Sequence, residues 1–155
     1  MNTVLSECFL FSGWSAQEVK QVAALCREKS LSVGQMLFSE GASSTSLYVV
    51  QSGSIKIEKA SGDDDQMVAQ FSKGSCFGEM GMLSTSNPGP RSASATASES
   101  SVVLELNYAD LEKLIEEHVH LGAKLYKALA ESLSTRIRKT TQDLASLKSL
   151  RLRHV

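Results

Sequence analysis

Between residues 31 and 106 glycines divide the chain into short apolar segments, and this spacing limits the folds open to it. The dividing glycines are Gly34, Gly41, Gly53, Gly62, Gly74 and Gly78. Within a segment such as 55–58, apolar and charged residues alternate, which is typical of a strand with one buried face. Turn residues about every 8–12 positions predict an all-β roll or sandwich. The strands expected from this pattern are 36–39, 47–52, 54–59, 66–71, 92–97 and 101–106.

A helical pattern precedes this β region. We expect residues 1–30 to form an N-terminal helical segment, because Ser15 and Glu18 match a capping box and an amphipathic stripe follows them to residue 28. The sequence therefore predicts a mainly β fold with flanking helices, in which the β region at 31–106 forms one domain.

The last part of the chain, residues 107–155, returns to a helical pattern. Asn107 is placed to cap a short helix over 108–117. A long helix is expected from about residue 120 to residue 150, with Gly122 as the joint between the two.

One apolar stripe follows the long helix. Its members are Leu125, Leu129, Leu133, Ile137, Leu144 and Leu147. From Leu133 through Ile137, Thr140 and Leu144 to Leu147 the steps are four, three, four and three residues, which is a heptad pattern. The pattern predicts a homodimer formed by a parallel pair of these helices. The alternative, an amphipathic helix that packs only on its own β region, stays open.

Composition excludes several classes of protein. No apolar run approaches about 18 residues, so no membrane span is expected. Residues 1–8 contain an acid and no basic residue, unlike a secretion signal. The three cysteines, Cys8, Cys26 and Cys76, are scattered and odd in number, which favours a reduced, cytoplasmic protein over a disulfide scaffold or a zinc site.

Charge is nearly balanced overall but uneven along the chain. The formal net charge is −1, which argues against a dedicated nucleic-acid binder. Residues 136–155, however, hold six Lys and Arg against the single acid Asp143. This basic segment could contact RNA, DNA or an acidic partner, but a solvated helix end whose cations suit the helix dipole is the favoured interpretation. DNA binding is therefore not expected.

No pattern of a catalytic or metal centre is present in the sequence. His118 and His120 stand two apart on a helix, so they point to different faces and cannot share a metal ion. The carboxylates at 63–65 lack the ligand spacing of an EF-hand and fit a solvated hairpin loop at 61–65. No Ser or Cys nucleophile has a base by motif, and no phosphate-loop lysine follows a glycine run. We expect neither an enzyme nor a metal protein.

Residues 77–93 contain the motif with the most specific chemistry. Phe77-Gly78-Glu79 opens a predicted helix, and Arg91 enters a strand after a Ser/Asn/Pro/Gly turn. A helix N-terminus attracts an anion, and an arginine adds a planar fork of donors that matches a phosphate. Beside a phosphate, Glu79 is favourable only if it accepts hydrogen bonds from a sugar hydroxyl. A phosphate, a ribose and a compact shape together indicate a cyclic nucleotide.

This motif resembles the phosphate-binding cassette of cyclic-nucleotide-binding domains, F-G-E-(L/I)-x-(L/M) followed by R-(S/A/T)-A. The resemblance covers roughly residues 10–145 and implies an eight-stranded β-roll with helices at both ends. The insert at 83–90 is longer than in many members of the family, and we expect it to loop outward without disturbing the residues on either side.

The resemblance assigns roles within the cassette. The main-chain N–H groups of the turn that contains Met80 and ends at Gly81, Met82 and Leu83 should hold the cyclic phosphate together with Arg91. The resemblance implies that the Ser92 hydroxyl adds a further donor. It implies that Glu79 accepts the ribose 2′-OH, and that Gly78 lets the main chain approach the ligand closely. In the empty protein a salt bridge between Arg91 and Glu79 is expected.

For the base, the family implies apolar walls from strands, here Ile57, Val68 and Phe71. A narrower resemblance to the bacterial catabolite activator branch places an R-x-x-x-T-S run on the long helix. This chain has Arg136 followed by Thr140 and Thr141 there, with Thr in place of Ser. The resemblance implies that Thr140 serves the ligand of its own subunit and Thr141 that of the other.

The hypothesis that joins these patterns is a stand-alone cyclic AMP sensor that acts as a dimer through an unidentified protein partner. The threonine pair favours adenine, although Ser92 can serve a guanine in some relatives, so cyclic GMP is the second choice. A cyclic dinucleotide fits poorly, because Glu79 would face a second phosphate. In the activator relatives a helix-turn-helix domain follows the long helix, and the present sequence stops at Val155. The alternatives are a module of the same fold without a ligand and a nucleic-acid-binding regulator.

Overall fold

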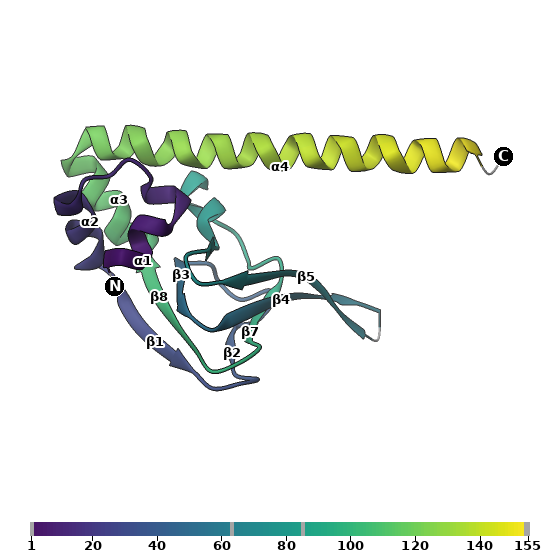
Figure 1. Cartoon of the computed structure of the whole chain (residues 1–155), viewed down its shortest axis with the longest axis horizontal. Helices are drawn as coiled ribbons and strands as arrows, with labels where there is room; N and C mark the ends of the chain where they lie inside the picture. Colours follow the sequence, from purple (N-terminus) through teal and green to yellow (C-terminus); the bar gives the residue numbers. More distant parts are fainter. Residues whose placement is uncertain (1, 63, 85, 154–155) are drawn as a thin grey trace.

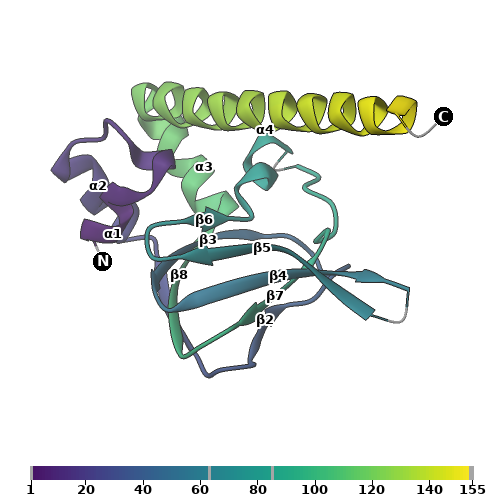
Figure 2. The same ribbon diagram turned by 45° about the vertical axis from the view of Figure 1, so that its right-hand side comes forward.

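The computed structural model describes residues 2–62, 64–84 and 86–153. Its described residues contain eight strands in two antiparallel four-stranded sheets, with strand orders β1-β8-β3-β6 and β2-β7-β4-β5 (Figures 1 and 2). The strands are β1 (Arg27–Leu31), β2 (Met36–Phe38), β3 (Ser46–Ser52), β4 (Ser54–Ser61), β5 (Asp64–Ser72), β6 (Cys76–Phe77), β7 (Ser94–Ala97) and β8 (Ser101–Asn107). The predicted mainly β fold, an eight-stranded roll flanked by helices, is confirmed.

The strand β3 shows how one sheet separates two hydrophobic cores. Successive side chains of a strand point to opposite faces. Leu47 and Val49 therefore join the cluster that the helices cover, whereas Tyr48 and Val50 join the cluster inside the roll. Because both faces of β3 are buried, its sequence is continuously apolar instead of alternating.

Two strands were missed by the sequence pattern. β1 has the sequence REKSL and is exposed except at Leu31, so it carries no apolar alternation. It is instead fixed by pairing with β8, from Arg27 opposite Glu105 to Leu31 opposite Ser101. β6 has only two residues. The predicted helix over 15–28 also ends early, since α2 spans Ala16–Ala23 and β1 follows.

The N-terminal helices cover one end of the roll. They are α1 (Asn2–Glu7), the 3-10 helix η1 (Phe9–Phe11) and α2. The predicted capping box is present, with Glu18 N–H donating to Ser15 Oγ at 3.2 Å and Ser15 N–H donating to Glu18 Oε1 at 2.8 Å. Phe11 packs edge-on against Trp14 with ring centroids 5.0 Å apart. All three cysteines are free thiols.

Two helices follow the roll, α3 (Tyr108–Glu117) and α4 (Val119–Arg153). Asn107 caps α3 as predicted, because its side chain accepts the Ala109 N–H at 2.9 Å. The joint lies at His118, where the backbone leaves the helical region, and not at Gly122. Gly122 lies within α4, where an added Cβ would stand 3.4 Å from the Ile115 Cβ, an ordinary van der Waals distance.

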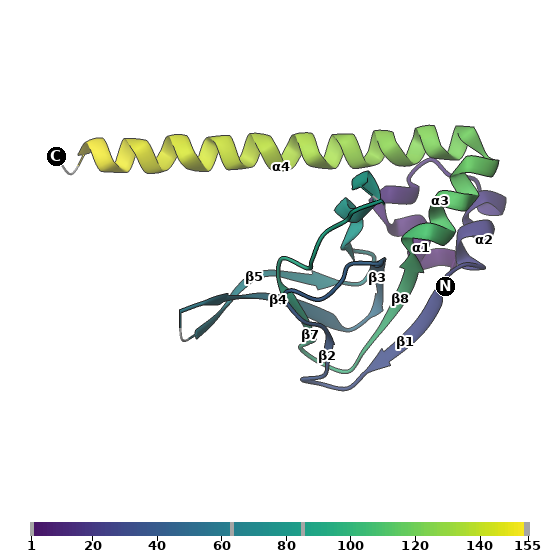
Figure 3. The ribbon, with the colours of Figure 1, turned by 180° about the vertical axis from the view of Figure 1, so that it is seen from behind.

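The first and last parts of α4 have different surroundings. Leu121, Leu125 and Leu129 are fully buried against the other helices, whereas the leucines and the isoleucine from Leu133 onward are exposed. Figures 1 and 3 show α4 running beside the roll and extending farther than strands β4 and β5. Asp63, in the predicted hairpin loop, lies outside the described residues, as do Met1, Thr85 and residues 154–155. No helix within the described ranges has the length and apolar content needed to cross a membrane.

Candidate functional site

Within the cassette, Gly78 leads directly into the 3-10 helix η2 (Glu79–Ser84). Gly78 has a φ of +77°, which glycine adopts without strain. A Cβ added there would lie 2.8 Å from Arg91 Nη1 and 3.3 Å from the Ser46 carbonyl oxygen. Glycine is therefore required at this position by the backbone conformation and by the arginine that crosses it.

A cavity of about 550 Å³ opens beside η2, within the size range of small-molecule sites. Figure 2 shows η2, in teal, between the roll and α4. The predicted residues that line the cavity are Ile57, Phe71, Gly78, Glu79, Met80, Gly81, Arg91, Ser92 and Arg136. Residues that sequence reasoning did not single out for the site also line it, among them Phe38, Ser44, Ala69, Pro88, Pro90 and Tyr108.

Arg91 is a buried cation, 7% exposed, in the wall of this cavity. Its Nη2 donates to the Ser46 carbonyl at 2.6 Å, and its guanidinium carbon lies 4.2 Å from the centre of the Phe38 ring. Its Nε is buried and has no hydrogen-bond partner among the described residues. No ion pair joins Arg91 to a carboxylate in the described ranges. The guanidinium therefore keeps a donor and a full charge that nothing in this part of the chain neutralises.

Glu79 is buried even more completely, at 1% exposed, and its partner comes from α4. Arg136 Nη2 donates to Glu79 Oε1, and the Arg136 side chain is about half exposed. The predicted salt bridge between Arg91 and Glu79 is therefore wrong. The carbonyl of Ser46 and the ring of Phe38 hold Arg91, so Glu79 is left to bond the helix. The site thus presents a cation and a carboxylate separately, one for each of two ligand groups.

Aromatic and aliphatic side chains form the apolar part of the cavity. Phe71 stacks on Phe77 with centroids 5.4 Å apart, and Ile57 and Ala69 lie opposite each other on β4 and β5. Val68 does not line the cavity, contrary to expectation. The β4–β5 pairing is irregular at this residue, because Ile57 faces Ala69 while Glu58 faces Met67, and the Val68 side chain is 56% exposed.

The insert before Arg91 does not simply loop outward, as was expected. Its first part is a local turn, in which Asn87 N–H donates to the Ser84 carbonyl at 3.0 Å. Its end returns to the roll, where Pro90 pairs with Ser43 in an isolated bridge. Pro88 and Pro90 consequently contribute to the cavity wall.

Thr140 and Thr141 do not reach the cavity within one chain. Both are exposed on α4, and their hydroxyls donate to the carbonyls of Arg136 and Ile137 at 2.9 Å, within their own helix. Their predicted roles toward the base stay predictions. Within the described ranges, no group of three His, Cys, Asp or Glu side chains is placed to hold a metal ion.

Comparison with known proteins agrees with this geometry. A family model described as a cyclic nucleotide-binding domain matches residues 28–118. A cAMP-dependent protein kinase regulatory subunit from Blastocladiella emersonii is 25% identical over 81% of this chain and 30% of its own length. A CRP-like cAMP-activated global transcriptional regulator from Mycobacterium tuberculosis is 26% identical over 95% of this chain and 63% of its own length. The chain thus spans less than two thirds of either relative.

A solved structure has the same fold over most of this chain. The N-terminal domain of a transcriptional regulator from Streptomyces coelicolor superimposes with a TM-score of 0.76 at 31% sequence identity. The match covers 90% of this chain and 95% of that domain. The similarity therefore includes the helices at both ends as well as the roll.

Proposed function

Since the chain belongs to the cyclic nucleotide-binding domain family, we propose that it is a sensor for cyclic AMP that binds the ligand in the cavity beside η2. The observation that carries this proposal is the buried Arg91 guanidinium, whose Nε has no partner among the described residues. Burying a charge without a counter-charge is unfavourable, so an anion bound in this cavity would be strongly stabilised.

The two charged side chains, Arg91 and Glu79, would bind different parts of the ligand. Arg91 and the main-chain N–H groups of η2 would hold the cyclic phosphate, and Ser92 at the cavity edge would add a hydroxyl donor. Glu79 would accept the ribose 2′-OH. Phe71 and Ile57 supply apolar surface for the rest of the nucleoside, as small-molecule sites commonly do.

Cyclic AMP is proposed ahead of cyclic GMP. The names of both relatives described above refer to cAMP, and Thr140 and Thr141 stand on α4 at the place that the activator resemblance implies for adenine contacts. Cyclic GMP is the second choice because the Ser92 hydroxyl lines the cavity and can serve a guanine.

A dimer through α4 would complete the site. The distal part of α4 carries exposed apolar side chains at heptad spacing, including Ile137, Leu144 and Leu147. Pairing two such helices would bury this stripe and bring Thr141 of one subunit toward the ligand of the other. The threonines, whose hydroxyls bond carbonyls of their own helix, would then have a function.

Ligand binding would act on α4 through Glu79. The carboxylate now bonds Arg136, and a ribose hydroxyl would claim the same oxygens. Any difference in how the ligand fits the two arrangements shifts the balance between them, typically by about 1–3 kcal/mol. We infer that a protein partner reads this change, and that the chain is a regulator and not an enzyme, as the names of its two relatives suggest.

Calorimetric titration tests this function. Cyclic AMP should bind with micromolar or tighter affinity, more tightly than cyclic GMP or a cyclic dinucleotide. Arg91→Ala should weaken binding by about 2–5 kcal/mol, because it removes one member of a buried charge pair with the phosphate. Arg138→Ala, which removes an exposed cation of α4, serves as the matched control and should bind normally. If millimolar cyclic nucleotide produced neither heat nor a thermal shift, the alternative of a module with the same fold and no ligand would be correct.

A further inference from the structure

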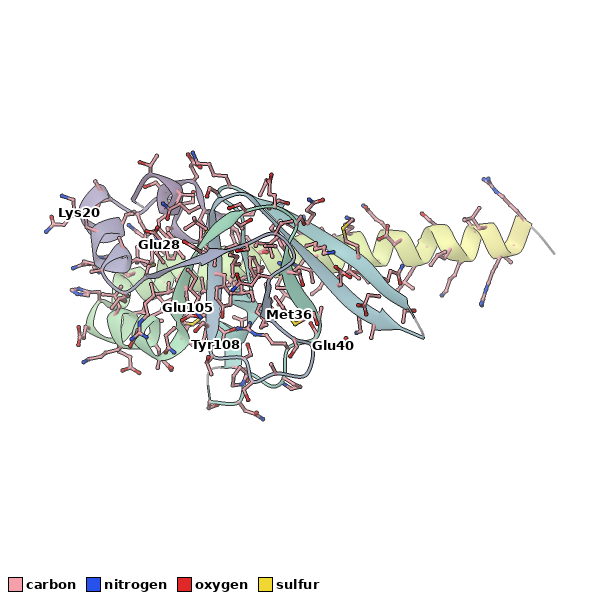
Figure 4. All side chains as sticks on the ribbon, turned by 90° about the horizontal axis from the view of Figure 1, so that it is seen from below. Lys20, Glu28, Met36, Glu40, Glu105 and Tyr108 are labelled. Carbon is pink, nitrogen blue, oxygen red and sulfur yellow. The ribbon has the colours of Figure 1, made fainter. Side chains whose placement is uncertain are left out.

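The cassette is in contact with a tyrosine that no motif in the sequence singles out. Tyr108 is the first residue of α3, is 4% exposed, and lines the cavity from the side of the helices (labelled in Figure 4). We propose that Tyr108 is the positioning residue of the cassette, which holds η2 in its binding conformation before any ligand arrives.

The hydroxyl of Tyr108 takes part in a directed chain of hydrogen bonds. It donates to the Gly78 carbonyl at 2.5 Å. A tyrosine hydroxyl has one proton, so the bond of 2.9 Å to Ser44 Oγ must run the other way, with Ser44 as donor. Hydroxyls in such a chain polarise one another, which strengthens the bond to Gly78. The carbonyl just before η2 is thereby fixed.

The ring of Tyr108 fixes the other end of the first turn of η2. A Cβ added at Gly81 would lie 2.3 Å from the Tyr108 hydroxyl and 2.4 Å from its Cζ. Gly81 has no positive φ, so its backbone conformation does not require glycine. The requirement is steric, and the three atoms nearest to the added Cβ all belong to Tyr108. Tyr108 thus holds both Gly78 and Gly81. The main-chain N–H groups proposed to bind the phosphate lie in η2, the helix that includes Gly81.

The main chain of Tyr108 ties this arrangement to the helices. Its N–H donates to the Thr45 carbonyl at 2.9 Å, next to Ser44, and α3 packs against both η2 and α4. A tyrosine in this place fixes the cassette relative to α3. The inference rests on the proposed function only in that the fixed amides are those proposed for the phosphate.

Tyr108→Phe is the direct test, because it keeps the ring and removes only the hydroxyl. Tyr48→Phe is the matched control. Tyr48 is 5% exposed, does not line the cavity, and donates its hydroxyl to Glu105 at 3.0 Å. Tyr108→Phe loses a buried hydroxyl with two hydrogen bonds, and Tyr48→Phe loses one with a single bond to the Glu105 carboxylate, so a general loss of stability should affect both.

Amide hydrogen exchange of the ligand-free proteins separates local positioning from general stability. In Tyr108→Phe the amides of residues 79–84 should exchange at least several-fold faster than in wild type, while in Tyr48→Phe they should not. Equal exchange of these amides in wild type and Tyr108→Phe would overturn the inference. This result does not depend on whether cyclic AMP binds, so it stands apart from a failure of the proposed function.

The ligand-bound measurement adds a second readout. Tyr108→Phe should bind cyclic AMP and cyclic GMP about three- to ten-fold more weakly, the scale of one lost hydrogen bond. The ratio of the two affinities should stay unchanged, because the fixed groups face the phosphate and not the base. An altered ratio, or an equal loss in Tyr48→Phe, would contradict the positioning role.

Discussion

The two parts of α4 belong to one apolar stripe but have opposite environments. Leu121, Leu125 and Leu129 are fully buried by the helices of their own chain. Leu144 and Leu147 continue the stripe at 57% and 59% exposure. Figure 4 shows the side chains near the end of α4 standing clear of the roll. The spacing of apolar residues therefore identifies the face of a helix that tends to be buried, but not the partner that buries it.

The residue that separates these parts in function is Arg136. It follows the last buried leucine by two turns and binds Glu79, so α4 contacts the cavity just where its own core ends. Beyond it, the apolar residues of the stripe are exposed. A ligand that competes for Glu79 would act at the boundary between the part of α4 that stabilises the fold and the part proposed to form the dimer.

Truncation of one leucine in each part of α4 should give the largest difference in the free energy of unfolding. Leu125→Ala should lower the free energy of unfolding by about 2–5 kcal/mol, because it leaves a cavity in a packed core. Leu144→Ala, at a concentration where the protein is monomeric, should change it little. Urea denaturation measures both values. Equal losses would mean that the distal stripe has a partner within its own chain.

Charge on the distal stripe should act on assembly instead. Leu144→Lys should weaken the dimer about ten-fold or more, since it places a cation in the predicted seam. Gln142→Lys adds the same charge to an exposed position off the stripe and should leave the dimer intact. Sedimentation equilibrium compares the two variants. A wild-type protein that stays monomeric at high concentration would refute the pairing of α4.

Removal of the boundary residue should have an intermediate effect on the fold. Arg136→Ala leaves the Glu79 carboxylate buried without its partner, which should lower the free energy of unfolding by about 1–2 kcal/mol. This is less than for a fully buried pair, because Arg136 is half exposed. Arg138→Ala, on the same helix and exposed, is the control. Equal shifts in the melting temperature of the two variants would show that the ion pair between Arg136 and Glu79 does not stabilise the fold.

The smallest effect is expected at the start of α4, where Glu18 bonds Lys124 and His120. The Ser15 main-chain N–H, followed by the Ser15 side chain and Lys124, lowers the pKa of Glu18 from 4.5 to about 2 against the opposing effect of burial. The stability that the ionised carboxylate contributes is therefore fully present above pH 4.5 and lost as pH falls toward 2. The difference in melting temperature between wild type and Glu18→Gln should shrink over that interval, and a constant difference would exclude the linkage.

Sequence patterns captured the parts of this molecule that depend on local order. Glycine spacing predicted most strands, the capping residues predicted the helix starts at Ser15 and Asn107, and the cassette motif singled out residues from Gly78 to Ser92 that line part of the cavity. β1 escaped because REKSL has no alternation and depends on β8 for its pairing.

The partners of the charged residues could not be read from the sequence. Arg91 bonds a carbonyl 45 residues away and Glu79 a guanidinium 57 residues away, so only the folded chain decides that they do not bond each other. The same holds for Tyr108, whose contacts with Gly78 and Gly81 depend on how α3 leaves the roll. The prediction for Val68 was wrong because a β-bulge turns this strand residue outward, and the sequence contains no signal of the bulge.

The most direct test of the central claim is the NMR signal of the Arg91 Nε–H group during titration with cyclic AMP. This donor is buried and has no partner in the described part of the chain, so a phosphate bound beside it should move its signal downfield. The shift should saturate at one ligand per chain, with the affinity found by calorimetry. An unchanged Arg91 signal in a protein that binds cyclic AMP would show that the phosphate lies elsewhere and would contradict the account.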